Sequence, residues 1–239
     1  NRINFMPDSK LAPMSAQQYQ KVLSQSRLSG NKKQKDMLER VGRRISSAAE
    51  AFVAENNLGM EFDWEFNLIE DKQVNAWAMP GGKLAVNRGL LTELNNEAEL
   101  AAVLGHEITH AAARHSAQQM QRALLLQAGV MAVAVAAGSA DERYAPLAVG
   151  SAALAASVLS QRYSREAELE ADYYGMGYMA RTGYDPYAAV TLQETFVRLS
   201  GGRNTNWVEG LFSSHPPSAE RVAQNRVRAQ QLGVRGELD

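Results

Sequence analysis

A histidine and a glutamate, followed by a second histidine one helical turn later, lie inside an apolar run. This arrangement constrains the fold of the chain more than any other feature. The segment extends from Gly105 to His110, and it is surrounded by apolar residues with helical spacing: Leu100, Ala101, Val103, Leu104 and Ile108. Residues four apart share a helix face, so His106 and His110 can direct two imidazole nitrogens at one ion. Because a buried His-Glu-His cluster is costly without a metal ion or polar partners, the segment predicts a buried helix with a metal site.

Glu107, the residue between the two histidines, fits a different role. It lies about 100° around the helix from His106, which suits a base beside the metal better than a ligand to it. Such a base takes the proton from a water molecule that attacks a carbonyl group. A chance match of a three-residue motif is the alternative, and the apolar surroundings argue against it.

The third metal ligand has to be found elsewhere, and it cannot be a thiolate because the chain has no cysteine. A third histidine soon after the motif would require a glycine three residues past His110 and a histidine three residues further on. Ala113 and Ser116 occupy those places, and His115 is one residue out of register. We therefore expect His115 on the surface or in contact with a metal ligand.

A later acidic segment, residues 164–172, offers glutamate as the third ligand. Glu168 and Asp172 are four residues apart and share a helix face. Glu168 is the predicted ligand, and Asp172 could accept the second N–H of a ligand histidine. Glu166 and Glu170 form the rival pair, and a solvated helix face is the plain alternative for all of these acids.

Hydrophobic periodicity predicts a mostly helical α+β fold. Residues 32–57 have helical spacing, whereas residues 60–69, 74–79 and 84–87 read as strands of a small antiparallel sheet with a turn at Pro80–Gly82. Further helices are expected at four places: from Asn95 or Asn96 to about Gln121, then 162–182, 185–199 and 217–233. Residues 1–14 show little pattern and are expected to lie over the surface. We divide the chain into an N-terminal extension, 1–30, and one domain, 31–239.

Bulk composition fits one soluble globular domain. The chain has 239 residues, of which 45% are hydrophobic, and its formal net charge is −1. This balance favours neither a nucleic-acid partner nor an acidic membrane surface. The first residue is Asn1, so we expect that an upstream segment such as a signal peptide or lipid anchor has been removed.

Three further segments accompany the histidine motif. They are residues 75–78 with Gly81 and Gly82, residues 163–166, and residues 213–217 with Arg221. Together with the motif, over about residues 70–222, they resemble the zinc metallopeptidase family that includes HtpX, BepA and the CAAX prenyl endopeptidases. The resemblance implies a gluzincin-like domain, mostly helical with a small sheet. It also implies a peptidase that acts on protein or peptide substrates and binds one Zn²⁺ per chain.

Residue roles follow from the resemblance. It implies His106, His110 and Glu168 as zinc ligands, Glu107 as general base, and Asp172 as the residue that orients a ligand histidine. His215 and Arg221 are implied near the metal, where the histidine of related proteins helps to bind the oxyanion or occupies the open position as a switch. The membrane helices of HtpX and the repeats of BepA are missing from the sequence. We therefore expect a minimal catalytic domain of the exported branch, periplasmic or associated with the outer membrane.

Two segments outside the motif have expected roles in substrate access. The strand at 74–79, with Asn75, Ala76 and Trp77, could pair with a substrate backbone at the edge of the sheet, and an ordinary hairpin is the alternative. Two Ala-rich apolar stretches, 123–137 and 145–159, are each shorter than the roughly 20 residues of a membrane span. We favour a buried helical hairpin over a membrane-dipping or partner-binding one. We expect it to border the active site as a lid or a membrane-proximal element, with membrane association through 123–159 as a possible partner contact.

The favoured function is a zinc endopeptidase, with envelope protein quality control as its setting by family analogy. A chaperone-like or scaffolding protein with an idle or structural zinc site is the alternative, since His215 could be a fourth protein ligand. A zinc aminopeptidase would need an acidic group for the substrate amine, and the sequence shows no distinctive motif for one.

Overall fold

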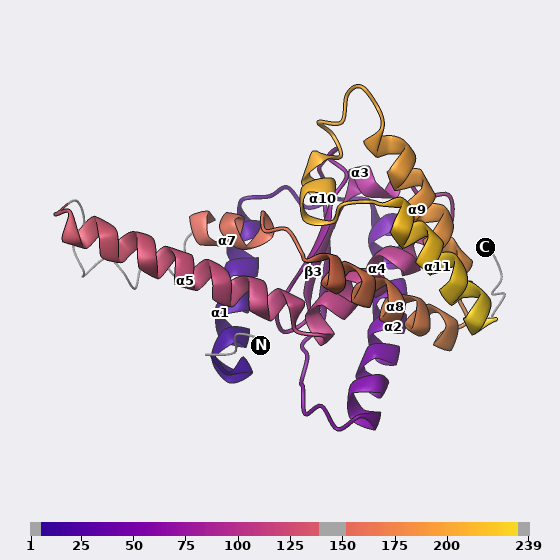
Figure 1. Ribbon diagram of the computed structural model, residues 1–239, viewed down its shortest axis with the longest axis horizontal. Helices are drawn as coiled ribbons and strands as arrows, with labels where there is room; N and C mark the ends of the chain where they lie inside the picture. Colours follow the sequence, from indigo (N-terminus) through magenta and orange to yellow (C-terminus); the bar gives the residue numbers. More distant parts are fainter. Residues whose placement is uncertain (1–5, 139–151, 234–239) are drawn as a thin grey trace.

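Three short strands lie between layers of helices in the computed structural model, which describes residues 6–138 and 152–233 (Figure 1). The strands are β1 (Glu65–Ile69), β2 (Ala76–Met79) and β3 (Lys83–Asn87), in the spatial order β1-β3-β2. The hairpin of β2 and β3 is antiparallel as expected, with Gly81 and Gly82 at positive φ in its turn. In contrast, β1 lies on the far side of β3 and runs parallel to it. The sheet is therefore mixed, and the expected wholly antiparallel sheet is wrong, because the connection 70–75 carries the chain past β3 before the hairpin begins.

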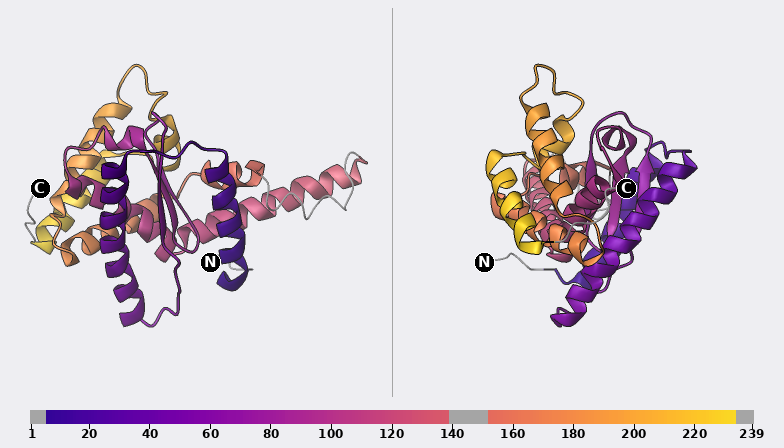
Figure 2. Two further views of the ribbon diagram at one scale, coloured as in Figure 1. Left: turned by 180° about the vertical axis from the view of Figure 1, so that it is seen from behind. Right: turned by 90° about the vertical axis from the view of Figure 1, so that its right-hand side faces the viewer.

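Helices cover both faces of this sheet (Figure 2). Alternate side chains separate the two faces: Phe66, Ala76 and Leu84 join one apolar cluster, while Met79 and Ala85 join another. The first face packs against α2 (Lys32–Glu55) and α4 (Glu97–Ala112), and the second against α1 (Asp8–Ser24) and α7 (Ala152–Leu159). The other helices are α3 (Arg88–Leu91), α5 (His115–Ala136), α8 (Arg165–Arg181), α9 (Tyr187–Ser200), α10 (Glu209–Ser214) and α11 (Ala219–Leu232). The expected α+β class, mostly helical with a small sheet, is confirmed.

The N-terminal region is more ordered than its sequence pattern indicates. Residues 8–14 begin helix α1 rather than lying irregularly over the surface, so that expectation is wrong. The buried face of α1 includes polar side chains, which weakens its hydrophobic pattern. Two of its hydroxyl groups donate to backbone carbonyls of the hairpin, Ser15 to Pro80 and Tyr19 to Leu84. These buried hydrogen bonds anchor α1 to the sheet.

The helix that carries the histidine motif ends earlier than predicted. The expected helix through Gln121 breaks at Ala113 and Arg114, and α5 begins at His115. Arg114 has a φ of 65°, a left-handed conformation that is uncommon for a residue other than glycine. An ion pair of 2.8 Å between Arg114 Nη2 and Asp8 Oδ1 ties this turn to α1. The break changes the chain direction just before His115, and this determines where His115 lies.

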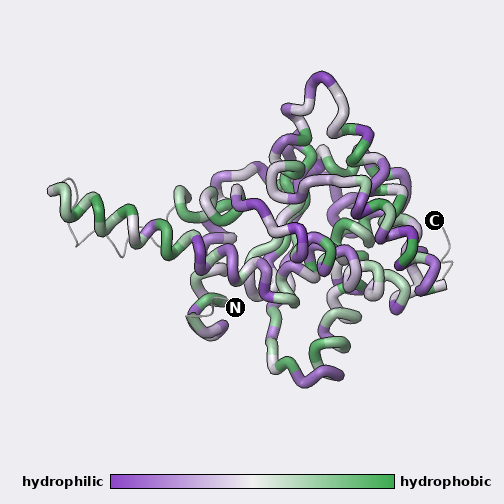
Figure 3. The backbone as a smooth tube through the Cα atoms, in the orientation of Figure 1, coloured by the Kyte–Doolittle hydropathy of each residue, from purple (hydrophilic) through white to green (hydrophobic). Residues whose placement is uncertain are grey.

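Most of the apolar stretch 123–137 forms the outer part of α5, an arm that extends beyond the rest of the fold (Figure 3). Leu126 is 63% exposed, and Val130 and Val133 are each 70% exposed, so the expected burial of this stretch is wrong. The described part of the second stretch forms α7, in which Leu154, Ala155 and Val158 are buried. Residues 145–151 of that stretch lie outside the described residues. Among the described helices, none combines the length and hydropathy needed to span a bilayer.

Candidate metal centre

Helix α4 brings three of the candidate residues together, and its first turn explains why it begins where it does. The side chain of Asn96 caps the helix by accepting a hydrogen bond of 2.9 Å from the N–H of Glu99. Glu97 and Glu99 place negative charge in the first turn, where the helix dipole favours it. Nearly every residue from Ala98 to Ala112 is buried. The helix thus positions its polar motif from within the core.

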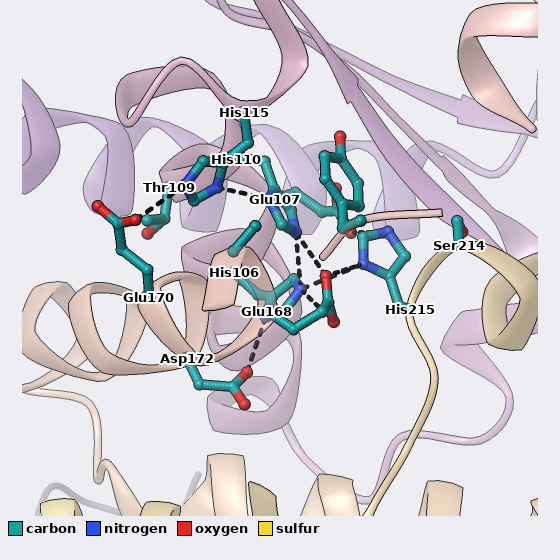
Figure 4. Close-up of polar contacts among 12 residues, drawn as sticks. His106, Glu107, Thr109, His110, His115, Glu168, Glu170, Asp172, Ser214 and His215 are labelled. Atoms are coloured by element: carbon teal, nitrogen blue, oxygen red, sulfur yellow. Dashed lines mark hydrogen bonds and ion pairs between the residues drawn. The ribbon is translucent and has the colours of Figure 1, made fainter. Parts of the chain in front are cut away.

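Four side chains converge on one point (Figure 4). His106 and His110 come from α4, Glu168 from the first turn of α8, and His215 from the residue after α10. One donor atom from each lies within 4.8 Å of all the others. The two Nε2 atoms of His106 and His110 are 3.0 Å apart, and Nε2 of His110 is 3.0 Å from Oε1 of Glu168. Nδ1 of His215 is 2.9 Å from the same oxygen.

This arrangement fits a small divalent cation. Four N and O ligands placed tetrahedrally at about 2.0–2.1 Å from zinc lie roughly 3.3 Å from one another, close to the separations found here. Nε2 of His110 faces both another imidazole nitrogen and a carboxylate oxygen. Two imidazoles and a carboxylate are a donor set typical of zinc sites, and a cation between these atoms would remove the repulsion among their lone pairs.

Asp172 and Arg221 support the cluster from the side of His106. The carboxylate of Asp172 accepts from Nδ1 of His106 at 2.8 Å and from Nε and Nη2 of Arg221 at 2.7 and 2.8 Å. Burial alone would raise the pKa of Asp172, but the charge and hydrogen bonds of Arg221 outweigh it and lower this pKa to about 2. Burial would lower the pKa of His106, yet the Glu168 and Asp172 carboxylates raise it to about 10. Asp172 is therefore an ionised acceptor that fixes the orientation of the His106 ring.

His115 supports the cluster from the side of His110. His115 is only 5% exposed, so the expectation that it lies on the surface is wrong. The structure supports the other alternative, in which His115 contacts a histidine of the cluster. Nδ1 of His115 lies 3.0 Å from Nδ1 of His110, and its Nε2 lies 3.0 Å from Oε2 of Glu170. Of the rival acidic pair, Glu166 is exposed and Glu170 contacts His115 rather than the four-residue cluster.

Glu107 lies beside the cluster rather than in it. It is 2% exposed, and its Oε1 is 3.2 Å from Nε2 of His215. Burial raises the pKa of Glu107, although the nearby His215 and His106 oppose this shift. Its other oxygen, Oε2, is buried without a hydrogen-bond partner among the described residues. A carboxylate with a raised pKa and a free oxygen can accept a proton from a reacting group.

Comparisons with known proteins point to one family. The family model described as "Peptidase family M48" matches residues 35–229, which is most of the chain. The chain belongs to peptidase family M48. It is therefore a metalloprotease, a hydrolase whose metal-binding site is this His/Glu cluster.

Named relatives of this M48 chain come from bacteria and from mitochondria. "Metalloprotease YcaL" of Escherichia coli is 32% identical over 78% of this chain and 69% of its own length. The "Mitochondrial metalloendopeptidase OMA1" of Schizosaccharomyces pombe is 35% identical over 68% of this chain and 45% of its own length. The "Beta-barrel assembly-enhancing protease" of Escherichia coli is 30% identical over 74% of this chain and 38% of its own length. The M48 chain spans less than half the length of the last two.

The remaining residues named from sequence belong to the sheet rather than to the M48 site. Asn75, Ala76 and Trp77 lie at or in β2, the edge strand of the sheet, and none belongs to the four-residue cluster. The backbone N–H of Ala76 is bonded to the side chain of Asn75 at 2.9 Å.

Sequence reasoning missed the role of Tyr163, whose ring stacks on that of His110 with centroids 3.7 Å apart. It also missed the pairing of Glu170 with His115. An aromatic residue directly before the acidic segment is the only signal that could have indicated the stacking.

Proposed function

We propose that this M48 chain is a zinc-dependent endopeptidase that cleaves protein substrates. In this proposal His106, His110 and Glu168 hold the ion, and Glu107 is the general base. The observation that supports it most is the buried Glu107 carboxylate, with a raised pKa and an unpartnered oxygen, directly beside a set of donors that suits zinc. Zinc bound there would supply the Lewis acidity that activates water and polarises the peptide carbonyl.

The protein side chains have separate roles in proton transfer, in orienting the ligands and in stabilising negative charge. Glu107 takes the proton of the attacking water and delivers it to the leaving amine, because its raised pKa suits both transfers. Asp172, held ionised by Arg221, keeps the His106 ring in the orientation in which Nε2 faces the cluster. Arg221 also places Nη1 2.9 Å from Oε2 of Glu168, so it brings positive charge next to the cluster where an oxyanion would develop.

The substrate backbone is proposed to pair with β2. This strand lies at the sheet edge, packs against α4 and carries Asn75, Ala76 and Trp77 at its start. An extended peptide added there would gain backbone hydrogen bonds, the usual mode of strand addition.

A second candidate function rests on His215. Its Nδ1 is 3.2 Å from Nε2 of His106 and 2.9 Å from Glu168, so it provides a fourth protein donor. A zinc ion with four protein ligands is typically structural. The alternative is therefore a latent or structural zinc site in a chaperone-like or scaffolding protein.

Metal content and casein cleavage, measured together, separate these functions. We expect one zinc per chain in the parent and in Glu107→Gln, with cleavage in the parent alone. Glu166→Gln, an exposed carboxylate on the same helix as Glu168, is the matched control and should retain both properties. Zinc without cleavage in the parent, followed by cleavage in His215→Ala, would identify a latent enzyme. Zinc without cleavage in either would favour the structural alternative, and failure to bind zinc would contradict both.

Location and membrane contact are also proposals. The name of the beta-barrel assembly-enhancing protease supports an exported enzyme that acts on envelope proteins during their quality control. We further propose that the outer part of α5 enters a lipid surface. Its exposed segment 124–136 is roughly 20 Å long at about 1.5 Å per residue, shorter than a hydrocarbon core of about 30 Å. The parent should co-sediment with phospholipid vesicles and Leu126→Gln/Val130→Gln should not. No co-sedimentation of the parent would favour a protein partner, and equal co-sedimentation of both would place lipid contact outside this segment.

A further inference from the structure

A cavity opens directly beside the metal cluster, on the side of α9. His106, Glu107 and His215 form part of its wall and also belong to or contact the cluster. The rest of the wall is mainly apolar and comes from α3, α4, α9 and α10: Leu90, Val103, Ala189, Leu192, Phe196 and Leu211. Cavity and cluster are therefore continuous, and a molecule that reaches one is in contact with the other.

The size of this cavity limits what it can hold. Water-sized molecules can occupy about 50 Å³ of it. One water needs about 10–15 Å³ measured in this way, so the space holds roughly three to five heavy atoms. That number matches the side chains of valine, leucine and methionine, and it is too small for phenylalanine or tryptophan.

The chemistry of the wall favours an uncharged occupant. Leu90, Leu192 and Leu211 are each at most 6% exposed and offer only apolar surface. Two further charged residues of the wall, Asp172 and Arg221, neutralise each other through two hydrogen bonds. An anionic guest would lose its hydration here next to the Glu107 carboxylate, and a cationic guest would find only Glu107, the proposed general base, as a partner of opposite charge.

Besides Glu107, a second polar side chain on the wall has an atom without a partner. Gln193 lies on the same face of α9 as Ala189 and Phe196, is 4% exposed, and its amide nitrogen has no hydrogen-bond partner among the described residues. A buried donor without a partner is costly, and the terminal torsion of glutamine rotates easily. A bound peptide with an acceptor near this wall would satisfy it.

We propose that this cavity is the specificity pocket of the peptidase and receives the side chain of one residue that flanks the cleaved bond. The preferred side chain is uncharged and of leucine, methionine or valine size. The inference rests on the proposed endopeptidase function. Consecutive Cα atoms are about 3.8 Å apart, so a peptide whose carbonyl lies at the cluster must place a neighbouring side chain at this cavity.

The test is cleavage of a peptide library in which the sequence is randomised around one central bond. Products are identified by mass spectrometry for the zinc-loaded parent protein. We expect leucine, methionine and valine to be enriched at least tenfold over aspartate, lysine and tryptophan at one of the two positions that flank the cut. Glu107-dependent cleavage without such enrichment would overturn the pocket and leave the proposed function intact.

Two variants test the assignment of the wall. Ala189→Leu, at the half-buried rim of the cavity, should fill it and shift the preference at that position to alanine and glycine. Phe196→Ala should enlarge the cavity and admit phenylalanine; because Phe196 also packs against Phe212, its thermal stability is measured alongside. Val227→Ala, an exposed apolar residue on α11, is the control and should keep the parental profile. Unchanged profiles in Ala189→Leu and Phe196→Ala would contradict the assignment.

Binding provides a second readout if the parent does not cleave. Peptides that differ only in a leucine or an aspartate at the flanking position are titrated by calorimetry into zinc-loaded Glu107→Gln. Binding of the leucine peptide at least tenfold more tightly, with the difference lost in the double variant with Ala189→Leu, would support the pocket. Equal affinities would overturn it. The absence of cleavage counts against the proposed function, whereas equal affinities count against the pocket alone.

Discussion

Both ring nitrogens of His106 and of His110 are engaged, and the two rings are held in different ways. His106 is held by a carboxylate, Asp172, which is itself paired with Arg221. His110 is held by a second imidazole, His115, and by the stacked ring of Tyr163. If Nδ1–H of His110 donates to His115, then His115 carries its proton on Nε2 and donates it to Glu170. This is a consistent chain of donors that leaves Nε2 of His110 free for the cluster.

His115→Ala should therefore weaken metal binding without removing a cluster donor. Loss of a residue that orients a metal-ligating histidine typically costs 10–100-fold in affinity. The measurement is competition for zinc against a chromophoric chelator, with His115→Gln as a partial rescue because its amide can still accept from His110. Glu166→Gln should match the parent. An affinity unchanged in His115→Ala would show that His110 does not depend on this contact.

The spacing of residues along the sequence was sufficient to predict which side chains of the site lie together in some cases, but not in others. The i, i+4 separations bring His106 to His110 and Glu168 to Asp172, so helix geometry predicts both pairs. His115 could not be placed, because its position depends on the break at Arg114. Arginine has no local preference for a left-handed conformation, and the ion pair with Asp8 joins residues far apart in sequence.

Helices α4 and α8 carry the cluster, and they approach most closely at two glycines. A Cβ atom built on Gly175 would lie 2.7 Å from the carbonyl carbon of Gly105, which directly precedes His106. The contact is between backbones, so neither side can move aside as a flexible side chain would. The spacing between the donors of the two helices depends on this pair of glycines.

Gly175→Ala should push the two helices apart. We expect the free energy of unfolding to fall by about 1–3 kcal/mol, as for other overpacked cores, together with weaker zinc binding. Gly177→Ala is a matched control on the same helix, since its added carbon would meet only the flexible guanidinium of Arg228 at 3.4 Å. It should be neutral or slightly stabilising because alanine is the better helix former. Equal effects in urea denaturation would contradict this account of the helix contact.

The start of α4 is connected to α2 by an ion pair that depends on pH. Arg40 Nη2 donates to Glu97 at 2.9 Å, and this bond, together with a weaker one from Tyr184, lowers the pKa of Glu97 despite its partial burial. A lowered pKa contributes stability above the unfolded value, about 4.3, and this contribution is lost as the pH falls through the folded value.

Arg40→Met should therefore destabilise the protein at neutral pH by no more than about 1 kcal/mol, because Arg40 is largely exposed to solvent. The difference from the parent should shrink as the pH falls below the pKa of Glu97. Urea denaturation at neutral and acidic pH measures it. A difference in the free energy of unfolding that grows as the pH falls would contradict this account of the Arg40–Glu97 pair.

Across the whole molecule, the sequence predicted where helices and strands form better than how they pack against one another. The helices around the cluster and the β2–β3 hairpin follow from periodicity and turn chemistry. The parallel pairing of β1 was missed because its partner is chosen by a tertiary contact. The exposure of α5 was missed because an Ala-rich apolar sequence has the same pattern inside a core as on an arm.

Removal of the metal should destabilise the entire domain. The donors come from α4, α8 and the segment after α10, so one ion would join three parts of the chain. A ligand present at 1,000 times its Kd stabilises the folded state by about 4 kcal/mol. A chelator should lower the Tm of the parent and of Glu107→Gln, and have little effect on Glu168→Gln. An unchanged Tm in the parent would mean that the cluster does not stabilise the fold through an ion.

The order of the donors along the chain has a consequence for biosynthesis. His106 and His110 leave the ribosome first, Glu168 follows, and His215 and Arg221 are made after it. A nascent chain thus carries the histidine motif before the residues that complete and support the centre exist. A chain whose synthesis has not reached His215 and Arg221 therefore lacks part of the centre and cannot yet act as the complete hydrolase.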